Sequence, residues 1–261
     1  MNILEKIVGD IRKDLRFKKE KINPSDLEKM PLFERDILSL SQSVRNASTG
    51  IIAEHKRRSP SKPHINFGLR LTDVAQGYEK AGVSGMSVLT NSQYFGGSLD
   101  DLLLARSASN LPLLRKEFIV DEYQILEAKA YGADAILLIA ACLDRNEIEQ
   151  LSTFSKSLGL EVLLEVHNLA ELNKSLMPSL DMLGVNNRDL TSFTVSIETS
   201  KALAKEIPSE FVKISESGIS EAVAVKELQE FGYQGFLMGE HFMKTQNPGE
   251  AANKFITELQ Q

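Results

Sequence analysis

Eight short apolar runs recur along the chain, and amphipathic stretches separate them. Run 135–141 has no polar alternation, which is typical of a strand covered by helices on both faces. The runs cover residues 51–53, 83–89, 111–114, 135–141, 162–166, 182–185, 212–214 and 235–238. This pattern predicts eight buried strands.

Apolar residues at helical spacing predict a helix after each strand. Capping residues such as Ser98 and Asp144 precede several of these stretches. The predicted helices cover 72–81, 99–108, 121–131, 144–158, 168–176, 196–206, 220–231 and 248–260. Eight alternations predict a (β/α)8 TIM barrel. A doubly wound α/β sheet competes, but no glycine-rich phosphate loop follows the first strand.

A helical extension precedes the barrel. Ile3, Ile7, Ile11 and Leu15 share one face of a helix predicted over 1–20, and a second helical pattern lies near 25–30. Residues 41–49 are polar and predict no element. We therefore expect an N-terminal extension over 1–48 and a catalytic barrel over 49–261, which together form one structural domain.

Composition narrows the class of protein. The 261 residues carry a net charge of −6, which argues against a general binder of nucleic acid or membrane surfaces. No apolar run is long enough to cross a membrane, and no signal-peptide core is present. The single cysteine, Cys142, excludes an intramolecular disulfide and suits the cytoplasm. Nothing in the sequence predicts an obligate protein partner.

Charged residues follow the strands, at the end where such barrels hold their active sites. Glu54 and Lys56 are two residues apart and so share a face. Lys116 follows the third run, and Glu165 lies near the end of the fifth. Together they could bind an anion and supply a proton donor and acceptor. A salt-bridged ring that only satisfies the barrel rim is the alternative.

The last two strands predict a phosphate site. Ser217 and Gly218 precede a helix, and Gly239-Glu240 ends the last strand. Backbone N–H groups at these turns can bind an anion, and Ser59 can add a hydroxyl. Ordinary glycine turns are the alternative.

Phe95 and Phe118, with Leu138 nearby, predict an apolar slot for a flat group. Core packing is the alternative, and it applies more to Leu138 than to the two phenylalanines. Cys142 has no histidine placed to activate it and is expected to be a passive thiol. His55 should point away from the barrel interior. The remaining histidines are scattered, so no metal site is predicted.

Seven ordered motifs resemble the signature of the indole-3-glycerol-phosphate synthase family. They include Glu-His-Lys-Arg-Arg-Ser-Pro after the first strand and Leu-Arg-Lys-Glu-Phe at the third. The motifs lie at 52–62, 87–98, 114–124, 163–167, 184–190, 215–219 and 235–240. One motif falls at each of seven strand ends, and the helical extension also resembles that of the family.

The resemblance implies a lyase of tryptophan biosynthesis that works without metal or organic cofactor. It closes the indole ring of 1-(2-carboxyphenylamino)-1-deoxyribulose 5-phosphate, releasing carbon dioxide and water. It further implies that Lys116 is the general acid, Glu165 the general base, and Lys56 the partner of the carboxylate. Glu54 and Asn186 are implied to make polar contacts and to stabilise charge, and Ser59, Gly218, Gly239 and Glu240 to bind the phosphate. Phe95, Phe118 and Leu138 are implied to pack on the ring. Arg188 and Ser217 are implied to contact the substrate in a less defined way.

Two other functions remain open from the sequence. A barrel such as phosphoribosylanthranilate isomerase would need a cysteine–aspartate acid–base pair, which Cys142 does not form. A non-catalytic barrel that binds a phosphorylated ligand would have no need of Lys116 or Glu165, and both are present.

Overall fold

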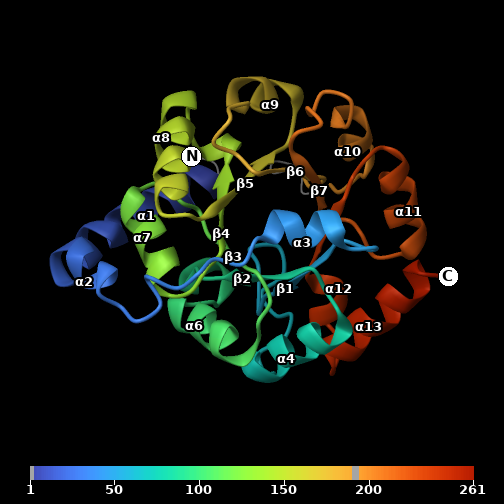
Figure 1. Cartoon of the computed structure of the whole chain (residues 1–261), viewed down its shortest axis with the longest axis horizontal. Helices are drawn as coiled ribbons and strands as arrows, with labels where there is room; N and C mark the ends of the chain where they lie inside the picture. The colour runs from blue at the N-terminus through green and yellow to red at the C-terminus, as the bar shows by residue number, and fades with distance from the viewer. Residues whose placement is uncertain (1–2, 190–193) are drawn as a thin grey trace.

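Eight parallel strands close into a barrel surrounded by helices in the computed structural model (Figure 1). The structure describes residues 3–189 and 194–261. Each strand pairs with the next, and β8 pairs with β1, so that Ile51 lies opposite Phe236. The strands are β1 (Ile51–His55), β2 (Gly85–Leu89), β3 (Leu113–Lys116), β4 (Ala135–Ile139), β5 (Glu161–Val166), β6 (Met182–Asn186), β7 (Val212–Glu216) and β8 (Gly235–Met238). The predicted TIM barrel is confirmed.

The outer helices lie close to the ranges predicted from their apolar spacing. They are α4 (Leu71–Ala81), α6 (Leu99–Ala108), α7 (Glu122–Ala130), α8 (Arg145–Ser157), α9 (Leu169–Ser175), α10 (Glu198–Leu203), α11 (Ala222–Glu230) and α13 (Pro248–Leu259). Shorter turns, which the periodicity did not predict, are α5 (Ser92–Phe95), η1 (Ala140–Cys142) and α12 (Glu240–Met243).

Strand β3 begins and ends two residues later than its apolar run. Arg115 and Lys116 belong to the strand. In the sequence, the change from apolar to charged residues at this point indicated that the strand had already ended. Arg115 is only 2% exposed because its guanidinium donates to the Gln124 carbonyl and, at 3.0 Å, to the Glu127 carboxylate on α7. A buried cation can sit in a strand when it is paired in this way.

Inward side chains of the odd-numbered strands form two layers. Residues two apart on a strand share a face. The lower layer is apolar and buried, and it consists of Ile52, Leu114, Leu163 and Ile214. Two residues further along the same strands lies a charged layer of Glu54, Lys116, Glu165 and Glu216. The charged layer therefore rests on an apolar floor.

The opposite end of the barrel is closed by α3 (Leu40–Asn46), within the segment predicted to hold no element. Figure 1 shows α3 crossing the centre of the ring of helices. Leu40 and Val44 are buried against the interior core of the barrel. A Cβ at Gly85 would lie 2.3 Å from Leu40 Cδ1, so the glycine that opens β2 makes room for this plug.

The first helix, α1 (Ile3–Lys21), uses its predicted apolar face to pack on the barrel. Ile7, Ile11 and Leu15 are buried against α7, in a cluster that also includes Leu27 of α2 (Pro24–Glu28). The division into an extension over 1–48 and a barrel over 49–261 within one structural domain stays a prediction.

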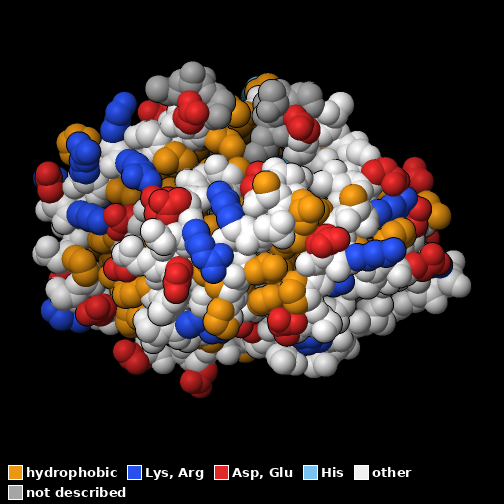
Figure 2. Space-filling view, turned by 90° about the horizontal axis from the view of Figure 1, so that it is seen from above, with side chains coloured by type: hydrophobic (Ala, Val, Ile, Leu, Met, Phe, Trp, Pro, Cys, Tyr) orange, Lys and Arg blue, Asp and Glu red, His pale blue; other side chains and the backbone are white. Residues whose placement is uncertain are grey.

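Acidic and basic side chains are interspersed over the face of the molecule that Figure 2 shows. Within residues 3–189 and 194–261, no helix has the length and apolar character needed to cross a membrane.

The contact between α4 and α13 depends on two glycines. A Cβ at Gly249 would lie 2.6 Å from the Cα of Gly77, and neither backbone can move without shifting a helix. We expect Gly249→Ala to lower the free energy of unfolding by about 1–3 kcal/mol, as overpacking does. The control is Gly9→Ala in α1, where a Cβ meets nothing within 4 Å. That change should stabilise the protein by about 0.5–1 kcal/mol. Urea unfolding measures both, and equal effects would contradict the packing argument.

Candidate active site

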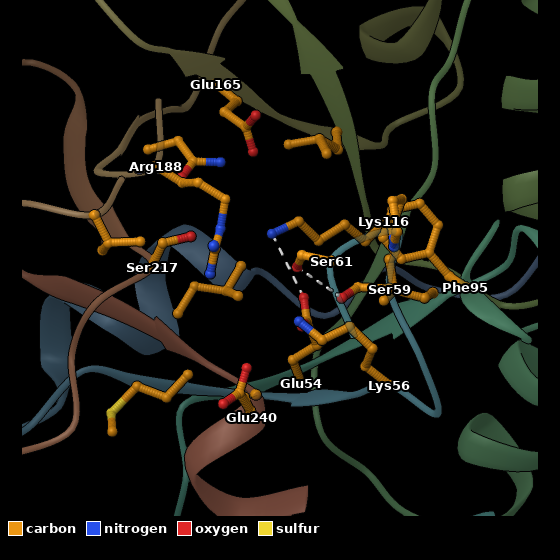
Figure 3. Close-up of a pocket in the computed structure, with 18 of the residues that line it drawn as sticks. Glu54, Lys56, Ser59, Ser61, Phe95, Lys116, Glu165, Arg188, Ser217 and Glu240 are labelled. Carbon is orange, nitrogen blue, oxygen red and sulfur yellow. Dashed lines mark hydrogen bonds and ion pairs between the residues drawn. The ribbon is translucent and has the colours of Figure 1, made fainter. Parts of the chain in front are cut away.

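A cavity of about 380 Å³ opens at the carboxyl ends of the strands. This volume lies within the range of small-molecule sites. Every predicted site residue except Leu138 lines it. In Figure 3 the side chains of Glu54, Lys116 and Glu165 enter the cavity from β1, β3 and β5. Those of Arg188, Ser217 and Glu240 lie around it on the segments that follow β6, β7 and β8.

An ion cluster lies at the centre of the cavity floor. The Lys116 ammonium donates to Glu216 Oε2 at 2.7 Å and lies 3.5 Å from Glu54 Oε2. The Lys56 ammonium lies 2.7 Å from Glu54 Oε1. Glu54 and Glu216 are almost fully buried, so their charges need these partners.

The cluster fixes the protonation of its members. Burial raises the pKa of Glu54, but Lys56 and Lys116 outweigh it and lower that pKa to about 2. Burial also disfavours the Lys116 ammonium, yet the carboxylates of Glu216, Glu54 and Glu165 raise the pKa of Lys116 above its ordinary value. Lys116 is therefore protonated at neutral pH.

Glu216 is the member that the sequence analysis missed. Burial raises the pKa of Glu216 above its ordinary value, with Lys116 opposing the shift and Glu165 adding to it. Alternation along β7, where Val212, Ile214 and Glu216 share a face, is the signal that could have identified it. The site has no room for a side chain at Gly184, because a Cβ there would lie 2.3 Å from Glu216 Oε1.

Glu165 and Asn186 face the same cavity from β5 and β6. Glu165 is 4% exposed, and its Oε1 lies 3.4 Å from His167 Nε2. Asn186 Oδ1 accepts a hydrogen bond from the Arg188 backbone N–H at 3.0 Å, which turns the chain at the end of β6. Leu190, the last residue of the sequence motif there, lies outside the described residues.

The turn after β7 has an unusual backbone. Ser217 and Gly218 have φ angles of 67° and 77°, a region that side chains rarely adopt. A Cβ at Gly218 would also lie 2.4 Å from Val195, and one at Gly239 would lie 2.5 Å from Glu54 Oε1. Both glycines therefore let the main chain form the cavity wall.

The loop after β1 crosses the mouth of the cavity. The Ser59 hydroxyl accepts from the Lys62 backbone N–H at 3.1 Å and lies 3.2 Å from the Ser61 hydroxyl. The Lys62 ammonium forms an ion pair with Glu240 at the start of α12. This pair ties the loop to the end of β8.

Aromatic side chains form an apolar wall. The ring centroids of Phe95 and Phe118 are 6.2 Å apart, with an interplanar angle of 35°. Leu138 was predicted beside them, and this placement is wrong. Leu138 is fully buried in the core between the barrel and its helices, whereas Leu137 and Ile139 line the cavity. A strand alternates its faces, so the neighbours of Leu138 point inward.

The extension also reaches the cavity. Ile3, Leu4 and Ile7 of α1 line its rim. Tyr94 of α5 donates a hydrogen bond at 2.6 Å to Asp10 of α1. The apolar spacing predicted which face of α1 is buried. It could not predict that part of this face lines the cavity.

His55 and Cys142 do not line the cavity. His55 is 1% exposed and does not line the cavity, and burial together with Arg57 lowers its pKa to about 4. Burial and the carboxylates of Glu165 and Glu171 raise the pKa of Cys142 to about 12, so it is a thiol rather than a thiolate. Among the residues that the structure describes, no group of three acidic, histidine or cysteine side chains could hold a metal ion.

The low pKa of Glu54 predicts an acid-sensitive contribution to stability. Its folded-state value lies below the unfolded one, so the contribution is complete above about pH 4.5 and is lost as pH falls toward 2. A drop of this size corresponds to about 3 kcal/mol. We expect Glu54→Gln to lose that part of the pH dependence in urea unfolding between pH 6 and 3. The exposed control Glu149→Gln should follow the wild type, and parallel curves for all three proteins would contradict the ion cluster.

Comparison with known proteins identifies a family over nearly the whole chain. The family model described as Indole-3-glycerol phosphate synthase matches residues 4–255. The indole-3-glycerol phosphate synthase of Bacteroides thetaiotaomicron is 42% identical over 259 residues, which cover 99% of each chain. That of Delftia acidovorans is 43% identical over 236 residues, 88% of each chain.

Solved structures support the fold alone. The 3-hexulose-6-phosphate synthase of Salmonella typhimurium superposes with a TM-score of 0.64 at 14% identity, over 81% of this chain and 98% of that one. The family match, in contrast, spans nearly the whole sequence and includes every strand of the barrel. The chain belongs to the indole-3-glycerol phosphate synthase family.

Proposed function

We propose that the protein converts 1-(2-carboxyphenylamino)-1-deoxyribulose 5-phosphate to indole-3-glycerol phosphate, carbon dioxide and water. Family membership supports this reaction, and the strongest support from the site is the arrangement of its acid and its base. A protonated Lys116, held between Glu54 and Glu216, faces the same cavity as Glu165 and the aromatic wall. An acid, a base and a flat apolar surface are what closure of an aromatic ring on a ketone needs.

Lys116 donates a proton to the ketone oxygen of the substrate while the ring carbon that bears the carboxylate forms the new C–C bond. The carboxylate then leaves as carbon dioxide, and its bonding electrons restore the aromatic ring. Lys56 then protonates the new hydroxyl, which leaves as water, while Glu165 accepts a proton from the ring carbon next to the nitrogen, so that the C=C bond of the indole forms. Glu165 and solvent return the two protons to Lys116 and Lys56. Lys56 binds the departing carboxylate and assists proton transfer.

Polar and apolar groups around the acid–base pair hold the substrate. Glu54 and Asn186 contact its hydroxyl and amine groups, and Arg188 and Ser217 complete the polar wall. Phe95 and Phe118 pack on the anthranilate ring, with Leu137 and Ile139 in the place predicted for Leu138. The phosphate binds at Ser59, Gly218, Gly239 and the backbone N–H of Glu240.

The ligand in this proposal is a phosphorylated small molecule, and the proposal includes no cofactor, nucleic acid, membrane or obligate protein partner. We place the reaction in the cytoplasm, as the single unpaired cysteine suggests.

The proposal predicts that purified protein forms a fluorescent indole product without added metal. Lys116→Met should lower kcat by about 10²–10⁴-fold, because a general acid contributes this much. The control is Lys254→Met on the exposed face of α13, which should leave kcat unchanged. Circular dichroism checks that both variants fold.

Binding and turnover separate the alternatives. If the wild type binds the substrate and forms no indole, the chain is a ligand-binding barrel and the proposed reaction is wrong. If Lys116→Met turns over at the wild-type rate, Lys116 is not the acid.

A further inference from the structure

The ring of His167 lies between two carboxylates. Its Nδ1 is 3.1 Å from Glu171 Oε2, and its Nε2 is 3.4 Å from Glu165 Oε1. The side chain is 9% exposed, and Nε2 makes no hydrogen bond among the described residues. One edge of the ring is therefore anchored, and the other faces the proposed general base.

The anchor comes from the start of α9. Glu171 Oε2 also accepts from the backbone N–H of His167 at 2.8 Å, and Glu171 Oε1 accepts from the Asn168 side chain at 2.8 Å. Asn168 caps α9 by accepting from the Glu171 backbone N–H at 2.9 Å. These contacts set the position of the His167 ring without any contribution from Glu165.

The surroundings favour a charged ring. Burial lowers the pKa of His167, but hydrogen bonding to Glu171 and the charges of Glu165, Glu171 and Glu216 outweigh it and raise that pKa. Burial and the charges of Glu165 and Glu171 raise the pKa of Cys142 of η1, so this neighbour stays a neutral thiol.

Two nearby lysines, Lys174 and Lys116, have other hydrogen-bond acceptors than Glu165. The Lys174 ammonium, on α9, donates to the carbonyl oxygens of Ala140 and Leu143 at 2.7 and 2.8 Å. Lys116 is bound to Glu216. His167 is thus the basic side chain that lies beside Glu165 at the end of the same strand.

We infer that His167, held in place by Glu171, is a positioning residue that donates from Nε2 to Glu165 Oε1 and directs the other carboxylate oxygen toward the substrate. This inference rests on the proposed function, in which Glu165 is the base. Catalytic hydrogen bonds are often long in ligand-free sites and shorten when substrate binds, so a 3.4 Å separation fits this role.

The test compares His167→Asn, His167→Gln and Glu171→Gln by kcat, KM and pH–rate profile. His167→Asn should lower kcat by about 10–100-fold with little change in KM, because it misplaces the base. The acid limb of kcat should move up by about one pH unit, since the variant lacks the cation that favours the carboxylate. Glu171→Gln should also lower kcat and raise the acid limb, but by smaller amounts than His167→Asn.

His167→Gln separates position from charge. Its amide can donate to Glu165 but carries no charge, so it should recover much of kcat and keep the displaced acid limb. The matched control is His64→Asn in the exposed loop after β1, which should keep the wild-type profile. NMR titration of His167 gives a readout that does not need activity: Glu165→Gln should lower the pKa of the imidazole.

Each failure has its own signature. Suppose that the wild type is active. If His167→Asn then leaves kcat and the pH profile unchanged, or if Glu165→Gln leaves the pKa of the imidazole unchanged, the inference is wrong and the proposed function stands. A wild type that forms no product overturns the proposed function, and with it the positioning role.

Discussion

The buried ion pairs of Lys116 with Glu54 and Glu216 are the interaction on which the rest of the site depends. Each of these carboxylates would be costly to bury alone, and each is paired within the cluster. The cluster rests on an apolar layer contributed by the same odd-numbered strands, two residues earlier. Its geometry is therefore fixed by the register of the barrel, and it places a protonated lysine at the cavity floor.

The surrounding structure leaves space for this cluster and covers it. Gly184 and Gly239 lack side chains where Glu216 and Glu54 approach the backbone. The loop after β1 is tied across the mouth by Lys62 and Glu240, and α1 contributes an apolar rim. The result is a site whose acid, Lys116, is held in place before substrate enters, which is how preorganised electrostatics lower a barrier.

The sequence predicted the barrel and most of the cavity because strand ends are marked by a change from apolar to charged residues. It failed where that contrast is missing. Run 135–141 is apolar on both faces, so Leu138 could not be distinguished from its inward neighbours. Polar residues around Leu40 and Val44 obscured α3. Glu216 lies two residues after an inward apolar residue, as Glu54 does, but the serine and glycine that follow it indicated a phosphate-binding turn instead. The contact of His167 with Glu165 depends on the fold of α9, which spacing does not specify.

The most direct test of this account is the titration of the Lys116 ammonium by NMR in protein labelled with ¹⁵N-lysine, with Lys116→Met to assign the signal. Three carboxylates raise the pKa of Lys116, so its signal should show the charged form through pH 10.4, the ordinary lysine value. A midpoint at or below that value would contradict the ion cluster as the basis of the site.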